Sequence, residues 1–231
     1  MTTNIINNNY ISKSGLYIVD DNSPSVIDIT NKSYVTFIMI NTTKPFTFNL
    51  EEGTILDFYG FFNENCSNKI LFNQLQPNSK LEVKTMYLTT KNDLSSNIKS
   101  YISTTNAKSN LEIVNIIKNN KLNIDSAIEI EENSKKIESY LNQTNIFIGD
   151  KGSVRGLPKL FVKTDDIKAG HSCKIHRINE DNLYYLNSRG LNKNDAVNIL
   201  IESNFNNLFK CLNMLDKNVL KKLEEIFFEN I

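Results

Sequence analysis

The sequence lacks the features that would direct it to a membrane, a nucleic acid or a secretory route. No uninterrupted apolar run approaches the roughly 20 residues that a helix needs to cross a bilayer. The N-terminal residues 1–15 are polar and rich in asparagine, so no apolar signal segment is visible. The formal net charge is zero, with 26 basic and 26 acidic side chains, which gives no basic footprint for nucleic acid or a membrane surface. We therefore expect neither partner.

Cysteine is scarce as well. The three cysteines, Cys66, Cys173 and Cys211, cannot all pair within one chain. An odd count without a visible signal segment is typical of reduced thiols, so the sequence predicts a cytoplasmic protein. We expect Cys211 to lie in the core of a late apolar helix and assign no chemistry to Cys66, which follows a turn-like stretch.

Motifs of common enzymes are missing. The chain has no G-x-x-x-x-G-K-[ST] phosphate loop and no G-x-S-x-G nucleophile turn. Asp165 and Asp166 are adjacent, so on a strand they point to opposite faces and cannot form the paired carboxylates of a polysaccharide-cleaving enzyme. We predict that the chain is not an enzyme.

Short segments rich in β-branched and aromatic residues fill the first 178 residues. Phe46, Phe48 and Leu50 alternate with polar residues, the period of two that indicates a half-buried strand. Many short strands, only eight glycines and no heptads predict an all-β body, and a sandwich, a barrel and a parallel β-helix all fit that pattern. Residues 91–107 are the exception, because their serines and threonines predict a loop around one helical turn.

The pattern changes after Ile178. We expect a β body over residues 1–178 and a helical region over residues 179–231. Asn179 is predicted to cap the first helix and Asp216 the last one. Asn192 followed by Asp195 resembles a capping box with Asp in place of Glu. The apolar C-terminal residues 227–231 fit core packing, or alternatively a groove on a partner.

Both histidines lie between Thr164 and Phe205. His171 and Cys173 are two residues apart, so on a strand they share a face and could share one metal. Imidazole and thiolate both suit iron or an iron–sulfur unit. The same spacing also fits a hydrogen-bonded structural histidine beside a small buried cysteine. His176 is expected on the opposite face, in a surface or helix-capping role.

Two of the three arginines also lie there. A chain that otherwise uses lysine keeps Arg177 and Arg189 in this stretch, which indicates a need for the planar, forked guanidinium. A cation beside helix-end carbonyls is the alternative reading of Arg189.

This stretch carries a family resemblance. It reads Asp165-Asp166-Ile167 to His171, then Arg177-Ile178, Leu183-Tyr184-Tyr185-Leu186 and Ser188-Arg189-Gly190, then a helix with Ala196, Leu200 and Phe205. These motifs resemble the C-terminal part of the SufB/SufD family, the scaffold proteins of the SUF iron–sulfur cluster assembly system. The resemblance runs from about residue 134 to residue 209, weakens back to residue 109 and is absent before residue 80.

The resemblance implies a right-handed parallel β-helix followed by a small C-terminal helical region. The position of the essential SufB cysteine, ahead of a G-D-K turn at Gly149-Asp150-Lys151, is occupied by Gln143. The chain therefore resembles the SufD type, shortened. His171, with Cys173 as a second candidate, would meet a transient, nascent iron–sulfur cluster shared with a partner subunit.

The resemblance also implies partners. A SufB-type subunit, or a second copy of this chain, would pair through the β-helix. A SufC-type ATPase would dock on the helical region, with Tyr184, Tyr185, Arg189 and Phe205 as candidate contacts. Two alternatives stay open: a self-sufficient homodimeric scaffold that uses Cys173 with His171, and a structural adaptor without a ligand role.

Overall fold

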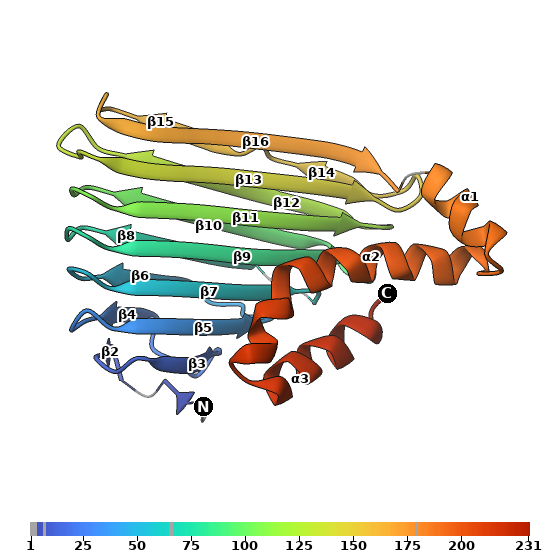
Figure 1. Cartoon of the computed structure of the whole chain (residues 1–231), viewed down its shortest axis with the longest axis horizontal. Coiled ribbons are helices and arrows are strands. Elements are labelled where there is room, and N and C mark those ends of the chain that lie inside the picture. Colours follow the sequence, from blue (N-terminus) through green and yellow to red (C-terminus); the bar gives the residue numbers. More distant parts are fainter. Residues whose placement is uncertain (1–3, 7, 65–66, 179) are drawn as a thin grey trace.

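The chain coils into a parallel β-solenoid of about five turns (Figure 1). The computed structural model describes residues 4–6, 8–64, 67–178 and 180–231. One sheet contains, in spatial order, β1 (Asn4–Ile5), β3 (Gly15–Val19), β5 (Tyr34–Ile40), β7 (Ile55–Phe62), β9 (Lys80–Thr89), β11 (Lys108–Ile117), β13 (Ile137–Phe147) and β16 (Ile167–Arg177). We refer to it as the long sheet. The predicted parallel β-helix is confirmed.

The second sheet faces the long sheet across the core. Its strands are β2 (Tyr10–Ile11), β4 (Val26–Ile29), β6 (Phe46–Leu50), β8 (Ser67–Gln74), β10 (Leu94–Ile102), β12 (Lys121–Ile130), β14 (Ser153–Arg155) and β15 (Lys159–Val162). The last two both pair in parallel with β12, so a short interruption separates them. This interruption, Gly156–Pro158, lies beside the candidate site.

The register between neighbouring strands places similar side chains next to one another in the core. Phe48 of β6 pairs with Phe72 of β8, and their rings stack with centroids 5.4 Å apart. Phe58 of β7 meets Phe72 edge-on across the interior at 5.1 Å. Because each turn repeats the previous one, an aromatic column forms without any repeat of fixed length in the sequence.

At several corners of the solenoid, asparagine occupies backbone positions that usually favour glycine. Asn31, Asn41, Asn78 and Asn106 all have positive φ, between 47° and 63°. Asparagine tolerates the left-handed region because its short polar side chain can hydrogen-bond locally. The amide of Asn106 donates to Asn78 Oδ1 at 2.6 Å, so successive corners are also tied together. This explains how so many turns form in a chain with few glycines.

The loop predicted over residues 91–107 is wrong, because β10 occupies most of it. Ser95 points outward, whereas Ser96 and Ser100 point inward. Ser96 Oγ lies 2.7 Å from Tyr87 Oη, and Ser100 Oγ lies 2.8 Å from Ser109 Oγ, both inside the core. Because serine replaces an apolar residue at two of its inward positions, the hydrophobic alternation of β10 is weak.

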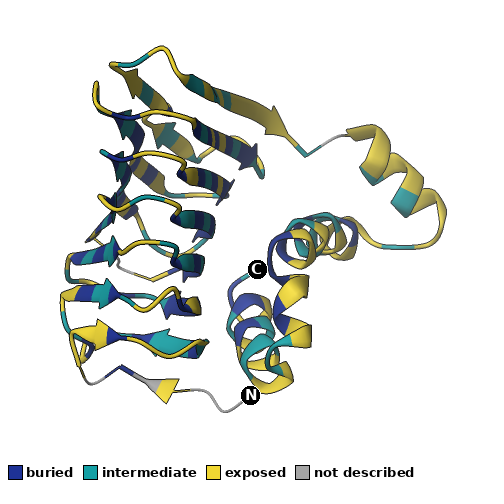
Figure 2. Ribbon diagram, turned by 60° about the vertical axis from the view of Figure 1, so that its left-hand side comes forward, coloured by how far each residue is buried: buried dark blue, intermediate teal, exposed yellow. Residues whose placement is uncertain are grey.

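The helical region folds back over the outer face of the long sheet (Figure 2). It contains α1 (Glu180–Ser188), α2 (Lys193–Phe209), the 3₁₀ helix η1 (Lys210–Met214) and α3 (Lys217–Phe228). Phe205, Phe209 and Phe227 are fully buried against one another and against Phe61 of β7. Phe227 thus belongs to the core, which is the first of the two alternatives given for residues 227–231.

Caps begin the later helices as expected. Asn192 Oδ1 accepts from the amide of Asp195 at 2.9 Å, while the Asp195 carboxylate accepts from the Asn192 side chain. Asp216 accepts from the amides of Asn218 and Val219. The predicted cap Asn179 lies outside the described residues.

The C-terminal residues are tied to two turns of the solenoid. Thr90 Oγ1 donates to the carbonyl of Asn230 at 2.6 Å, and Lys91 Nζ donates to that of Glu229 at 3.2 Å. Lys118 Nζ reaches the carbonyl of Ile231 at 3.4 Å. None of the helices in the described part of the chain is long and apolar enough to span a membrane.

Candidate functional site

The last turn of the solenoid is open at its outer edge. β16 pairs with β13 on one side and is the terminal strand of the long sheet, and most of its side chains are exposed (Figures 1 and 2). A terminal strand presents a row of backbone groups that another chain can pair with. Large apolar side chains are exposed around this end of the solenoid: Leu157, Phe161, Val162 and Ile175.

His171 is oriented by a backbone carbonyl from the neighbouring sheet. Its Nδ1 lies 2.9 Å from the oxygen of Pro158. A carbonyl only accepts, so Nδ1 carries the proton, and in the neutral imidazole Nε2 keeps its lone pair. Within the described residues Nε2 has no hydrogen-bond partner. A carbonyl on one ring nitrogen and a free second nitrogen is the arrangement of a metal-ligating histidine.

The Pro158 carbonyl is positioned by the break between β14 and β15. Gly156 in this break has φ of 115°, and a Cβ there would lie 1.7 Å from the carbonyl oxygen of Ile124. Only glycine fits, for both conformational and steric reasons. The carbonyl of Gly156 itself accepts from Gln143 Nε2 at 3.4 Å. The break therefore directs two carbonyls toward side chains of the long sheet.

Cys173 lies on the same face of β16 as His171. Their register partners on β13, Leu141 and Gln143, are both fully buried inside the solenoid. The Cys173 thiol is exposed at the open end and accepts from Asn145 Nδ2 at 3.4 Å. Partial burial raises the pKa of the Cys173 thiol, and the Asn145 hydrogen bond offsets only part of that effect. The thiol form is thus favoured over the thiolate.

Gln143 is a core residue. It is fully buried, accepts from Ser126 Oγ at 3.0 Å and donates to Asn145 Oδ1 at 3.3 Å. An amide at this position cannot ionise, so Gln143 cannot supply the thiolate that the resemblance to the SufB type implies here. The contact of Asn145 with Cys173 and the Gly156–Pro158 break were not predicted from the residue pattern. The Gly-x-Pro sequence of that break is a signal from which an interruption of the strand could have been predicted.

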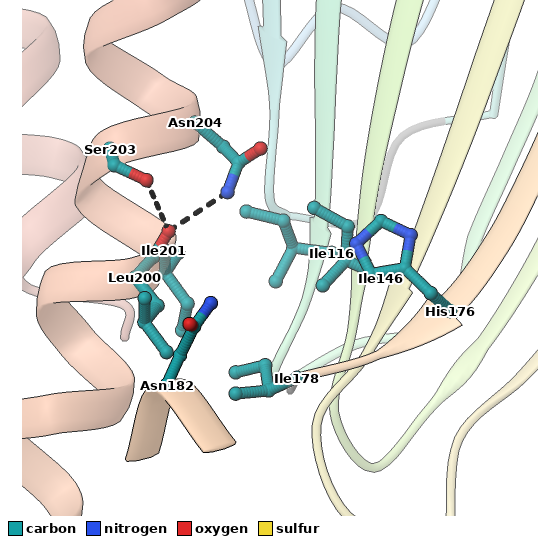
Figure 3. A pocket seen from close by; sticks show the side chains of 9 residues that line it. All are labelled: Ile116, Ile146, His176, Ile178, Asn182, Leu200, Ile201, Ser203 and Asn204. Carbon is teal, nitrogen blue, oxygen red and sulfur yellow. Dashed lines mark hydrogen bonds between the residues drawn. The ribbon is translucent and has the colours of Figure 1, made fainter. Parts of the chain in front are cut away.

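His176 faces the other way, toward the helical region. Its register partner on β13 is Ile146, which belongs to the apolar layer beneath α2. His176 lines a cavity of about 180 Å³. Figure 3 shows it across from α2, where Ser203 and Asn204 both donate to the carbonyl of Leu200. The two histidines of β16 thus lie on opposite faces, and only His171 lies on the face that opens at the end of the solenoid.

The predicted docking residues separate into two groups. Tyr184 and Tyr185 of α1 are 77% and 57% exposed, and Arg189 stacks over the Tyr185 ring at 5.3 Å. No described residue of α1 is buried. Phe205 is a correction: it is fully buried in the core that α2 shares with β7, so in this conformation it packs rather than docks.

Cys211 is also corrected. It was expected in the core, but it is exposed on η1, because the change from α-helix to 3₁₀ helix after Phe209 turns Leu212 inward instead. Cys66 lies outside the described residues. In the described part of the chain no three His, Cys, Asp or Glu side chains cluster to hold a metal. His171 and Cys173 together offer one nitrogen and one sulfur donor.

The structure is thus a parallel solenoid with an oriented imidazole on its last strand and a short helical region after it. The family model described as "SUF system FeS cluster assembly, SufBD core domain" matches residues 27–204. The chain therefore belongs to the SufBD family of iron–sulfur cluster assembly proteins.

Three curated relatives illustrate the similarity. The iron–sulfur cluster assembly protein SufD of Escherichia coli is 30% identical over 74 residues, which are 32% of this chain and 18% of the relative. SufD of Bacillus subtilis is 30% identical over 73 residues, 32% of this chain and 17% of the relative. A SufBD family protein of Synechocystis is 34% identical over 59 residues, 26% of this chain and 13% of the relative. The matched part spans less than a fifth of each of these relatives.

Proposed function

We propose that this chain is a SufD-type subunit of a cytoplasmic iron–sulfur cluster assembly scaffold. It pairs through the open last turn of its solenoid with a SufB-type subunit and docks a SufC-type ATPase on its helical region. The observation that carries the proposal is the oriented imidazole of His171 on the terminal strand of the long sheet. The exposed apolar side chains around it fit an interface with another protein.

In this proposal His171 contributes Nε2 to a nascent cluster, which is cargo and not a resident cofactor. Cys173 is the weaker candidate, because the thiolate is the ligand form and burial favours its thiol. A tetrahedral iron uses four ligands, and two donors do not complete that set. The remaining ligands come from sulfide and from a cysteine of the partner subunit, since Gln143 cannot supply one.

The ATPase docks on α1. This helix has an exposed pair of tyrosines and a guanidinium that is already ordered on one of them. Aromatic and arginine side chains dominate the energetics of protein interfaces. No phosphate loop occurs in the sequence, so nucleotide hydrolysis belongs to the partner.

Co-purification tests the two interfaces separately. The tagged chain is co-expressed with SufB-type and SufC-type proteins. Ile175→Glu, at the open end, is expected to lose the SufB-type partner and keep the ATPase. The double substitution Tyr184→Ala and Tyr185→Ala is expected to do the opposite. Tyr10→Glu, an exposed aromatic at the far end of the solenoid, is the matched control and should keep both. Capture of neither protein by the unmodified chain would reject the assembly.

A histidine pair on one strand tests the ligand role. His171→Ala is expected to lower iron–sulfur enzyme activity in cells that depend on this chain, while His176→Ala on the opposite face is expected to leave it unchanged. Equal activity in both variants, with partners still bound, would leave only the structural adaptor.

A second candidate function is a homodimeric scaffold that needs no SufB-type subunit. The shared face of His171 and Cys173 favours it, because two copies would bring two imidazoles and two thiols to one seam. Anaerobic reconstitution of the purified chain with iron and sulfide separates the two candidates. A visible cluster that disappears in Cys173→Ser supports the homodimer, and no cluster in the unmodified chain supports the mixed assembly.

A further inference from the structure

The interior of the solenoid contains polar side chains among its apolar ones, including two hydrogen-bonded groups that lie along one column. The first group lies between the middle turns. Tyr87 Oη and Ser96 Oγ are 2.7 Å apart, and Ser96 Oγ donates to Asn68 Oδ1 at 2.6 Å. All three residues are at least nine-tenths buried.

The second group lies nearer the open end. Asn145 Oδ1 accepts from Asn115 Nδ2 at 2.7 Å and from Gln143 Nε2 at 3.3 Å. Asn145 Nδ2 donates to Cys173 Sγ at 3.4 Å. Ser126 extends the group toward the second sheet through Gln143. This group therefore joins the buried interior to the candidate site.

Register places the two groups in contact range. Tyr87 pairs with Asn115, and Asn115 pairs with Asn145, so the three side chains stand in one column on successive strands. Neighbouring strands are about 4.8 Å apart, so side chains of one column can be joined directly, as Asn115 and Asn145 are, or through a bridging water.

Three buried polar atoms in and beside this column lack partners among the described protein atoms: Asn68 Nδ2, Thr85 Oγ1 and Asn115 Oδ1. They comprise one donor, one acceptor and one hydroxyl that can do both. Buried polar groups without a protein partner are commonly satisfied by ordered water, which donates two and accepts two hydrogen bonds. Thr85 lies two residues before Tyr87, on the same inward face of β9.

We propose that ordered water molecules bind inside the solenoid at Thr85, Asn115 and Asn68 and join the two groups into one polar column. The column runs from the middle turns to Asn145, whose amide contacts the Cys173 sulfur. The inference does not depend on the proposed function. It assigns these interior side chains a common role in binding water, and it places the inner end of a hydrated path beneath the exposed thiol.

The sign of a stability change separates a wet from a dry interior. Thr85→Val replaces a hydroxyl by a methyl of the same shape. In a dry interior this removes an unpartnered group and raises the melting temperature, whereas in a hydrated one it breaks a water bridge and lowers it. We expect a lower melting temperature. Ser100→Ala is the control, because its hydroxyl is bound to Ser109 and its loss should lower the melting temperature in either case.

A direct count of internal water gives the second measurement. Oxygen-17 magnetic relaxation dispersion of the unmodified chain is expected to show long-lived water molecules, and Thr85→Val to lose at least one of them, while Ser100→Ala keeps the full number. A raised melting temperature in Thr85→Val, or a count that this substitution does not change, would overturn the proposal. Because Thr85→Val keeps side-chain shape, the test does not depend on a variant that fails to fold.

Discussion

The imidazole Nδ1 of His171 lies 2.9 Å from the carbonyl oxygen of Pro158, which lies in the break between β14 and β15. The two residues are joined by the turn that leads from β15 to β16, so the contact closes the last turn of the solenoid upon itself. It sets the orientation of the ring and leaves Nε2 available. The candidate site therefore depends on the backbone path of Gly156–Pro158 as much as on the histidine.

Gly156→Ala tests that dependence. The new Cβ would meet the Ile124 carbonyl at 1.7 Å, so the segment must move and the Pro158 carbonyl with it. We expect a loss of unfolding free energy of more than about 1–2 kcal/mol, the usual cost of a left-handed backbone alone. In nitrogen NMR spectra the His171 ring is expected to lose its preference for the Nδ1-protonated tautomer.

Gly149→Ala is the matched control for this substitution. Gly149 also has a positive φ, 75°, but nothing lies within 4 Å of its added Cβ. The Gly149→Ala variant should lose only the unfolding free energy that a left-handed backbone costs, and its His171 tautomer should be unchanged. An equal response of both variants would remove the steric argument.

The thiol of Cys173 is expected to titrate above the ordinary range. Partial burial raises its pKa, so alkylation by iodoacetamide in a Cys66→Ser, Cys211→Ser background should reach half its maximal rate at a higher pH than a small free thiol. Because the folded chain holds this proton more tightly than the unfolded chain, unfolding free energy falls as pH rises from the ordinary thiol pKa through the raised one.

Asn145→Ala sharpens the thiol prediction. It removes the hydrogen bond that lowers the pKa, so the midpoint of alkylation should move to still higher pH. A midpoint that moves down would mean that Asn145 stabilises the thiol and not the thiolate.

Phe205→Ala is predicted to destabilise the fold instead of abolishing a contact with a partner. The side chain is fully buried among Phe61, Phe209 and Phe227, and truncation of a buried phenylalanine costs about 3–5 kcal/mol. Urea denaturation measures the loss. Phe228→Ala, at a position 48% exposed, is the control and should cost much less.

A tyrosine on the outer face of the long sheet gives a pH prediction. The Tyr34 hydroxyl donates to the Asp57 carboxylate, and this hydrogen bond, followed by partial burial, raises the pKa of Tyr34 to about 12. The folded chain keeps the proton longer than the unfolded chain, so stability is lost as pH rises from about 10 toward 12. Asp57→Asn should lower the titration midpoint, which ultraviolet difference spectra against Tyr34→Phe would record.

Local chemistry explains which elements could be predicted from the sequence. The alternation of Phe46, Phe48 and Leu50 predicts a strand because one face is apolar, and Asn192 and Asp216 predict helix starts because capping is a short-range interaction. β10 was not predicted as a strand because its inward positions include Ser96 and Ser100, whose hydrogen-bond partners lie on other strands. The shared face of His171 and Cys173 follows from strand geometry alone.

The remaining site features come from contacts between separate segments. Nothing in the residues around His171 predicts that its ring meets Pro158, because that contact needs the break at Gly156. The inward position of Phe205 and the outward position of Cys211 likewise depend on where the helical region meets the long sheet. These relations arise from the order of the strands, which a single sequence does not display.

The cover that the helices place on the long sheet has a consequence for biosynthesis. α3 and the end of α2 pack on side chains as early in the chain as Leu16 and Ile38. A ribosome makes the chain from its N-terminus, so the strands emerge well before their cover exists. During that interval the apolar outer face of the long sheet is exposed to solvent or to a chaperone, until the helices that bury it have been translated.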